Sequence, residues 1–145
     1  MSYSTIADVQ IAAGGEARLR ELSDVDRTNQ VNLAAVESAI VEADAIINSW
    51  VHKRHGIDIP APAPPTIRAI SAAMAVYILK TRKANMVSEV DIQLQEQRIE
   101  QLRQFSRGET TLGVYPEPAK SEKIIDLASD RSDLVISRNS LKGFC

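Results

Sequence analysis

The stretch Pro65-Thr-Ile-Arg-Ala-Ile-Ser-Ala-Ala-Met-Ala-Val-Tyr-Ile-Leu-Lys-Thr-Arg82 is the most apolar part of the chain and decides its fold. Large apolar side chains recur at helical spacing, and alanine or valine fills most positions between them. A helix that is apolar nearly all round has to be buried on most sides. We therefore expect this helix to be the central one, with no face left for water. The apolar run from Ala69 to Leu79 is far shorter than the ~20 residues that a membrane span requires.

The residues before this segment predict a long amphipathic helix. Asn32 is a good N-cap, and from there to Gly56 apolar side chains recur at spacings of three and four. These side chains are Leu33, Val36, Ile40, Ala43, Ile47, Trp50 and Val51. Acidic residues between them, Asp44 included, are expected on other faces of the helix. The four prolines within residues 57–65 then end helical structure, because each one removes a backbone donor.

Weaker signals complete an all-helical architecture. Thr5 and Asp8 form a capping-box pattern that predicts a helix to about residue 13, and a second short helix is expected over residues 16–22. Ser88 opens another helix, which Gly108 ends. Its apolar stripe is thin and it carries five glutamines, so we expect it to be half exposed. The predicted fold class is mainly α, a small helical bundle of three main helices plus short N-terminal helices.

An extended C-terminal arm, residues 111–145, follows the helical body of residues 1–110. Small apolar clusters alternate there with turn-prone and polar residues, and few large apolar side chains are present. Such a segment cannot bury enough apolar surface to form a core of its own, so we expect partners to order it. The arm residues predicted to dock into a partner are Leu134, Val135, Ile136, Arg138, Leu141 and Phe144.

Composition and charge argue against several classes of function. The chain of 145 residues has 17 Lys and Arg against 19 Asp and Glu, a net charge of −2. A protein that coats DNA would usually have a basic surface. A small basic cluster of Lys80, Arg82 and Lys83 is a candidate surface for DNA or an acidic partner, although complementing a helix dipole also explains it. The one cysteine, Cys145, allows no internal disulfide.

The sequence offers no complete set of catalytic or metal-binding residues. His52 and His55 lie one turn apart, but no third ligand accompanies them and two basic residues separate them. The loop that starts at Asp24 has the first carboxylates of a calcium loop, but Asn29 replaces the turn glycine. The common phosphate-binding and hydrolase motifs are not found in the sequence. We expect no enzymatic activity, no cofactor and no metal.

Four pieces of the sequence, taken in order, carry a family resemblance. They are Met1-Ser-Tyr-Ser-Thr-Ile-Ala-Asp8, the stretch Arg20–Asp24 with the amphipathic helix after it, the proline-rich residues 57–65 with the apolar helix, and the ending Leu134–Phe144. The chain thereby resembles the head–tail connector family of tailed phages, also called adaptor or head-completion proteins, of the Mu-like type. Within the ending, Asn139 and Lys142 replace a commoner Asp and Arg.

The resemblance implies a virion protein rather than an enzyme. Such proteins form a ring of about twelve copies beneath the portal, which joins the head to the tail and continues the DNA channel. The implied partners are the portal protein, a tail-side neck or tail-terminator protein and further copies of the chain itself. Double-stranded DNA passes without specific binding, and no membrane takes part. The implied location is the virion neck, and the host cytoplasm during assembly. The alternative is a small helical nucleic-acid-binding or regulatory module.

Overall fold

The computed structural model describes residues 1–55 and 59–110, and five α-helices fall within these ranges. They are α1 (Ile6–Ala13), α2 (Glu16–Ser23), α3 (Leu33–His55), α4 (Pro65–Thr81) and α5 (Glu89–Arg107). The described residues contain no strand. The predicted mainly α class is confirmed, and the helices begin and end at or next to the expected residues.

Local side-chain chemistry explains where the helices begin and end. Thr5 and Ser88 are the N-caps of α1 and α5, and each exchanges hydrogen bonds with an Asp three residues later in a complete capping box. Gly14 and Gly108 end the same two helices with φ angles of 95° and 88°. These are left-handed conformations that glycine adopts without the penalty of a Cβ atom. Asn32 caps α3, because its side-chain oxygen accepts from a backbone N–H three residues on, at 3.1 Å.

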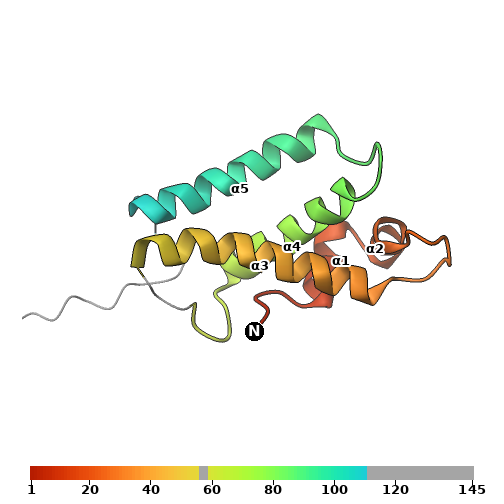
Figure 1. Ribbon diagram of the computed structural model, residues 1–145, viewed down its shortest axis with the longest axis horizontal. Coiled ribbons are helices and arrows are strands. Elements are labelled where there is room, and N and C mark those ends of the chain that lie inside the picture. The colour runs from red at the N-terminus through yellow and green to blue at the C-terminus, as the bar shows by residue number, and fades with distance from the viewer. Residues whose placement is uncertain (56–58, 111–145) are drawn as a thin grey trace, which may run out of the picture. The chain divides into compact units, whose positions relative to one another are not determined.

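Helix α4 is the centre of the bundle and contacts each of the other four helices. It runs in the opposite direction to α3, its most extensive neighbour (Figure 1). Helix α5 lies along α3 in the same direction as α3 and contacts α4 less (Figure 1). The two short helices α1 and α2 also contact α4. The central position expected for the apolar segment is therefore confirmed.

The core consists of apolar side chains from all five helices. From α4 it includes Ile67, Ile70, Met74, Ala75 and Leu79; from α3, Val36, Ile40, Ala43, Ile47 and Val51; and from α5, Leu102 and Phe105. Burying one large aliphatic side chain stabilises the fold by about 1.5–3 kcal/mol. One expectation about α4 is wrong, because Ala69 is exposed and Ala73 is half-buried. Within residues 1–55 and 59–110 no other helix covers Ala69, so one strip of the apolar helix is exposed.

The sequence pattern places Asp44 on a face of α3 outside the apolar stripe, but at this residue that face is not open to solvent. Its side chain is buried, and Oδ2 accepts from the backbone N–H of Tyr3 at 2.9 Å while Oδ1 accepts from the Ser71 hydroxyl at 2.6 Å. The Ser71 hydroxyl also lies 2.8 Å from the hydroxyl of Ser4. A buried carboxylate is tolerated only when hydrogen bonds satisfy it. Asp44 therefore holds the N-terminal segment against α3 and α4.

Candidate functional site

The predicted basic cluster does not form one surface, because its three side chains contact three different helices. Lys80 Nζ lies 2.6 Å from Asp91 Oδ1 of α5. Arg82 lies 3.0 Å from Glu42 of α3 and also donates to a hydroxyl and a backbone carbonyl of that helix. Lys83 donates to the backbone carbonyl of Glu21 in α2. The three cations therefore connect the C-terminal end of α4 to its neighbours.

The Lys80–Asp91 ion pair is the least exposed of these contacts, since each side chain is 18% exposed. The hydrogen bond from Lys80, followed by the backbone N–H of Ser88, lowers the pKa of Asp91 to about 2 from an ordinary value of 3.8. Asp91 thus serves two functions at once, as the partner of Lys80 and as the capping-box acid of α5. Its position fixes the N-terminal end of α5 relative to α4.

The residues considered as metal ligands form no metal site in the described part of the chain. No group of three or more potential ligands occurs among the described residues. Backbone N–H groups of Thr28 and Asn29 donate to the two carboxylate oxygens of Asp24, at 2.9 and 2.7 Å. These bonds lower the pKa of Asp24, and the bond from Thr28 has the largest effect. The Asp24 carboxylate therefore stabilises the loop that follows it in sequence. His52 lies on an exposed part of α3, and the side chain of His55 lies outside the described residues.

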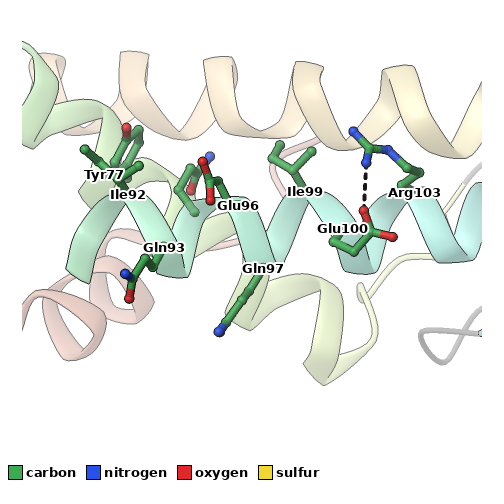
Figure 2. A pocket seen from close by; sticks show the side chains of 9 residues that line it. Tyr77, Ile92, Gln93, Glu96, Gln97, Ile99, Glu100 and Arg103 are labelled. Carbon is green, nitrogen blue, oxygen red and sulfur yellow. Dashed lines mark hydrogen bonds and ion pairs between the residues drawn. The ribbon is translucent and has the colours of Figure 1, made fainter. Parts of the chain in front are cut away.

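A groove of about 770 Å³ runs along α5. We call it the α5 groove. Its apolar lining comes from Tyr77 of α4 and from Ile92 and Ile99 of α5, and its polar lining includes Glu96 and Arg103. Figure 2 shows Ile92, Glu96, Ile99 and Arg103 along the side of α5 that faces α3. Ile92 is 43% exposed, so the groove presents apolar surface to solvent.

The ends and walls of the α5 groove differ in their polar groups. At the C-terminal end, Arg103 lies 2.8 Å from Glu100 and 6.0 Å from the ring centroid of Trp50 in α3. Figure 2 draws the ion pair between Arg103 and Glu100. Glu96 has no ion pair among the described residues. Among the described residues, the groove thus has a paired cation at one end and a carboxylate without an ion pair near its middle.

Gln95 has an unsatisfied hydrogen-bond acceptor in the wall of the α5 groove. Its side-chain oxygen Oε1 is buried and has no hydrogen-bond partner among the described residues. Leaving such an atom unpaired costs about 1–3 kcal/mol, so buried acceptors of this kind usually have a donor. The α5 groove therefore combines apolar surface with an acceptor that needs an N–H or O–H donor.

A second uncovered surface lies across α4. Ala69 lines two hollows. One, of about 360 Å³, also contains Ile11 and Ala12 of α1. The other, of about 380 Å³, also contains Ala73 of α4 and Leu94 of α5. Ile11 is 79% exposed and Leu94 is 41% exposed. We call these five residues the open face of α4. Contiguous exposed apolar surface of this kind marks protein–protein contacts in soluble proteins.

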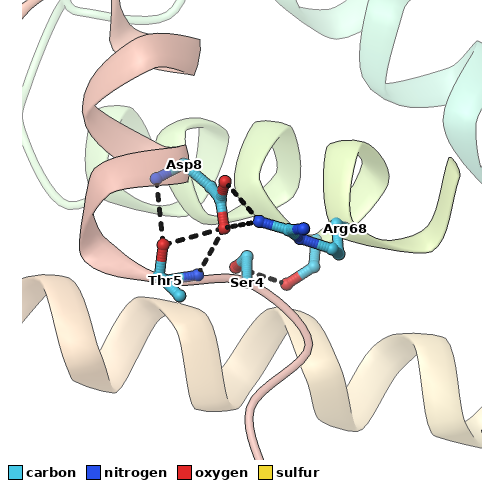
Figure 3. Close-up of polar contacts among 5 residues, drawn as sticks. Ser4, Thr5, Asp8 and Arg68 are labelled. Carbon is cyan, nitrogen blue, oxygen red and sulfur yellow. Dashed lines mark hydrogen bonds and ion pairs between the residues drawn. The ribbon is translucent and has the colours of Figure 1, made fainter. Parts of the chain in front are cut away.

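Polar contacts hold the rim of the open face in place. Arg68 of α4 lies 3.0 Å from Asp8 of α1, and Asp8 also belongs to the capping box with Thr5 (Figure 3). The backbone N–H of Thr5 is the main cause of the lowered pKa of Asp8, and Arg68 adds to it. On the other side, burial lowers the pKa of the Arg98 guanidinium, which lines the hollow beside α5. The apolar strip of α4 is thus flanked by the charged side chains of Asp8, Arg68 and Arg98.

Comparison with protein families identifies the chain. The model of the family described as bacteriophage Mu, Gp36, matches residues 3–126. The chain belongs to this family. A comparison with curated proteins gives no match. The predicted resemblance to a Mu-like phage protein is therefore confirmed, and the finer role of a head–tail connector is taken up below as a proposal.

The Gp36 family match covers all five helices and both uncovered surfaces. It begins at Tyr3, whose backbone N–H binds Asp44, and it ends at residue 126. It therefore stops before the closing motif that contributed to the sequence resemblance. The six predicted docking residues of the arm also lie outside the described residues: Leu134, Val135, Ile136, Arg138, Leu141 and Phe144. Among the described helices of this Gp36 family member, none is long and apolar enough to cross a membrane.

Sequence reasoning identified neither of the two surfaces. The α5 groove had a signal, because the thin apolar stripe and five glutamines indicated a half-exposed helix. Ile92 belongs to that stripe, yet it projects into the groove rather than into the core. The open face had no such signal, since the apolar pattern of α4 does not reveal which side lacks a covering helix.

Proposed function

We propose that this Gp36 family member is a structural protein of the phage neck, where copies of it form a ring that joins the head to the tail. The ring continues the DNA channel beneath the portal, and double-stranded DNA passes through it without specific binding. Its partners are the portal protein on one side and a tail-side neck or tail-terminator protein on the other. A closed ring of about twelve copies would match a portal. The role is structural rather than catalytic.

The open face of α4 is the observation that carries this proposal, together with membership of a phage Mu family. The central helix of the body is apolar nearly all round, but in the described part of the chain no helix fully covers Ala69 and Ala73. Exposing such a strip in a free monomer is unfavourable, and contact with a second copy would remove it from water. In a ring each copy uses two different surfaces, so the open face of one copy would meet another surface of the next.

Imaging of intact particles tests the location directly. We expect density for this protein in the neck, between the portal and the first tail protein, at a stoichiometry that fits a ring. Density elsewhere in the particle, or none at all, would refute the proposal.

A substitution pair tests the proposed contact. Ala69→Glu places a charge on the open face, whereas Ala45→Glu places the same charge on an exposed position of α3 outside it. Both positions are exposed alanines within helices, so both variants should fold. We expect Ala69→Glu to abolish ring assembly with the portal and to lower the yield of joined particles, while Ala45→Glu behaves as wild type. Equal behaviour of the two variants would contradict the role of the open face.

A further inference from the structure

The α5 groove has the features of a site that receives an extended peptide. It combines the apolar surface of Tyr77, Ile92 and Ile99 with the unpaired carboxylate of Glu96 and the buried acceptor Gln95 Oε1. A ligand that completes this site needs apolar side chains, positive charge and at least one free N–H donor. An extended peptide segment can offer all three. Its side chains supply the apolar groups and the positive charge, and its backbone N–H groups are free donors because they have no partner within the segment.

Residues 134–145 of this chain match that requirement. They contain three adjacent apolar residues, Leu134, Val135 and Ile136, and a later aromatic, Phe144. They include the two cations Arg138 and Lys142 but no acidic side chain. The segment therefore has the charge that complements Glu96 as well as the donors that Gln95 lacks.

The length of chain between the groove and this segment favours docking on another copy. Residues 111–133 separate the end of the described body from Leu134, and an extended chain of that length spans about 80 Å. Helix α5 itself has 19 residues, which corresponds to about 28 Å. This connection is far longer than a return to the same helix needs, and it is sufficient to reach a neighbouring subunit.

We propose that residues 134–145 of one copy occupy the α5 groove of a neighbouring copy in the ring. The inference rests on the proposed function, since the ring is what brings a neighbour within reach. A donor from the segment satisfies Gln95 Oε1, a cation of the segment pairs with Glu96, and apolar side chains cover Ile92 and Ile99. Each copy then gives one arm and receives one arm, which is compatible with a closed cyclic assembly.

Photo-crosslinking in assembled particles tests this docking. The full chain would carry a photoreactive phenylalanine analogue in place of Phe144, and isotopically heavy and light copies would be mixed before assembly with the portal. We expect crosslinked peptides that join position 144 of one copy to residues 92–103 of another. Crosslinks found only within one copy, only on the portal or only on a tail protein would overturn the inference.

Two groove substitutions, with a control from the same helix, make the test specific. Ile92→Glu should lower the crosslink yield at least tenfold, whereas Val90→Glu should not, because Val90 is 62% exposed on α5 and does not line the groove. Gln95→Leu should lower the yield without lowering the melting temperature, since it removes the unsatisfied acceptor. Equal yields for Ile92→Glu and Val90→Glu would overturn the docking site.

The failure of this inference can be told apart from the failure of the proposed function. If the protein forms a ring in the neck but position 144 does not crosslink to residues 92–103 of another copy, only the arm docking is wrong. If the protein is absent from the neck, both proposals are wrong.

Discussion

Replacing Asp44 with alanine should destabilise the fold more than any surface charge does. The carboxylate is buried and accepts two hydrogen bonds, from the backbone of Tyr3 and from the Ser71 hydroxyl. A hydrogen bond to a charged group contributes about 1.5–3 kcal/mol to stability. Two such bonds set the upper limit of the stability that Asp44→Ala loses. The actual loss is smaller, because Ser71 keeps Ser4 as a partner and because the variant no longer buries a charge. We expect Asp44→Ala to lower the free energy of unfolding by about 2–4 kcal/mol.

Two further variants separate the hydrogen bonds of Asp44 from its charge. Asp44→Asn keeps one acceptor but presents an NH₂ group to the second donor, so it should cost about 1–2 kcal/mol. Glu37→Ala removes an exposed carboxylate from the same helix and should change stability by less than about 0.5 kcal/mol.

Urea unfolding of the full chain, followed by far-ultraviolet circular dichroism, measures all three variants of this series. The urea midpoint should be highest for Glu37→Ala, lower for Asp44→Asn and lowest for Asp44→Ala. The slope of the unfolding free energy against urea concentration should be the same for all three. A loss below about 0.5 kcal/mol for Asp44→Ala, or an equal loss for Glu37→Ala, would show that the buried carboxylate does not anchor the N-terminal segment.

Three other predictions concern acid stability, the core and metals. Because folding lowers the pKa of Asp91 from 3.8 to about 2, its stabilising effect is complete above pH 3.8 and is lost as the pH falls toward 2. Asp91→Asn should therefore lower stability by about 1–2 kcal/mol at pH 7 and by roughly a third of that at pH 2.5 in urea unfolding, and an equal difference at both pH values would contradict this. Ile70→Asp buries an unpaired charge and should cost about 3–5 kcal/mol, whereas Gln97→Ala should change the melting temperature little; similar effects of the two would contradict the position of α4. Elemental analysis should find no stoichiometric zinc or calcium, and a chelator should leave the melting temperature unchanged, so a drop would reveal a metal site.

The sequence predicted the helices well because their signals are local. Capping boxes at Thr5 and Ser88, the glycines at 14 and 108, and the prolines before α4 each act within a few residues. Periodicity also identified most of the core face of α3. The pattern did not show that Asp44 is buried, because its partners, Tyr3 and Ser71, are 41 and 27 residues away in sequence. A buried acid cannot be recognised before the donors that satisfy it are known.

The candidate surfaces were harder to predict for a related reason. Exposure of Ala69 depends on which neighbours α4 has, and a helical pattern contains no such information. Likewise, Lys80, Arg82 and Lys83 lie within four residues of one another but contact different helices, because the end of α4 meets α5, α3 and α2 at once. Charges that are neighbours in sequence need not form one surface.

The uneven packing of α5 has a consequence for how the molecule opens. Only Leu102 and Phe105 of this helix are buried, and both lie in its C-terminal half. Segments with few buried apolar contacts open at lower free energy than the core, so backbone amides of residues 92–98 should exchange with deuterium faster than those of α4. The N-terminal half of α5 is therefore the part of the body that a bound partner can slow most, and amide exchange would record that binding without any substitution in the chain.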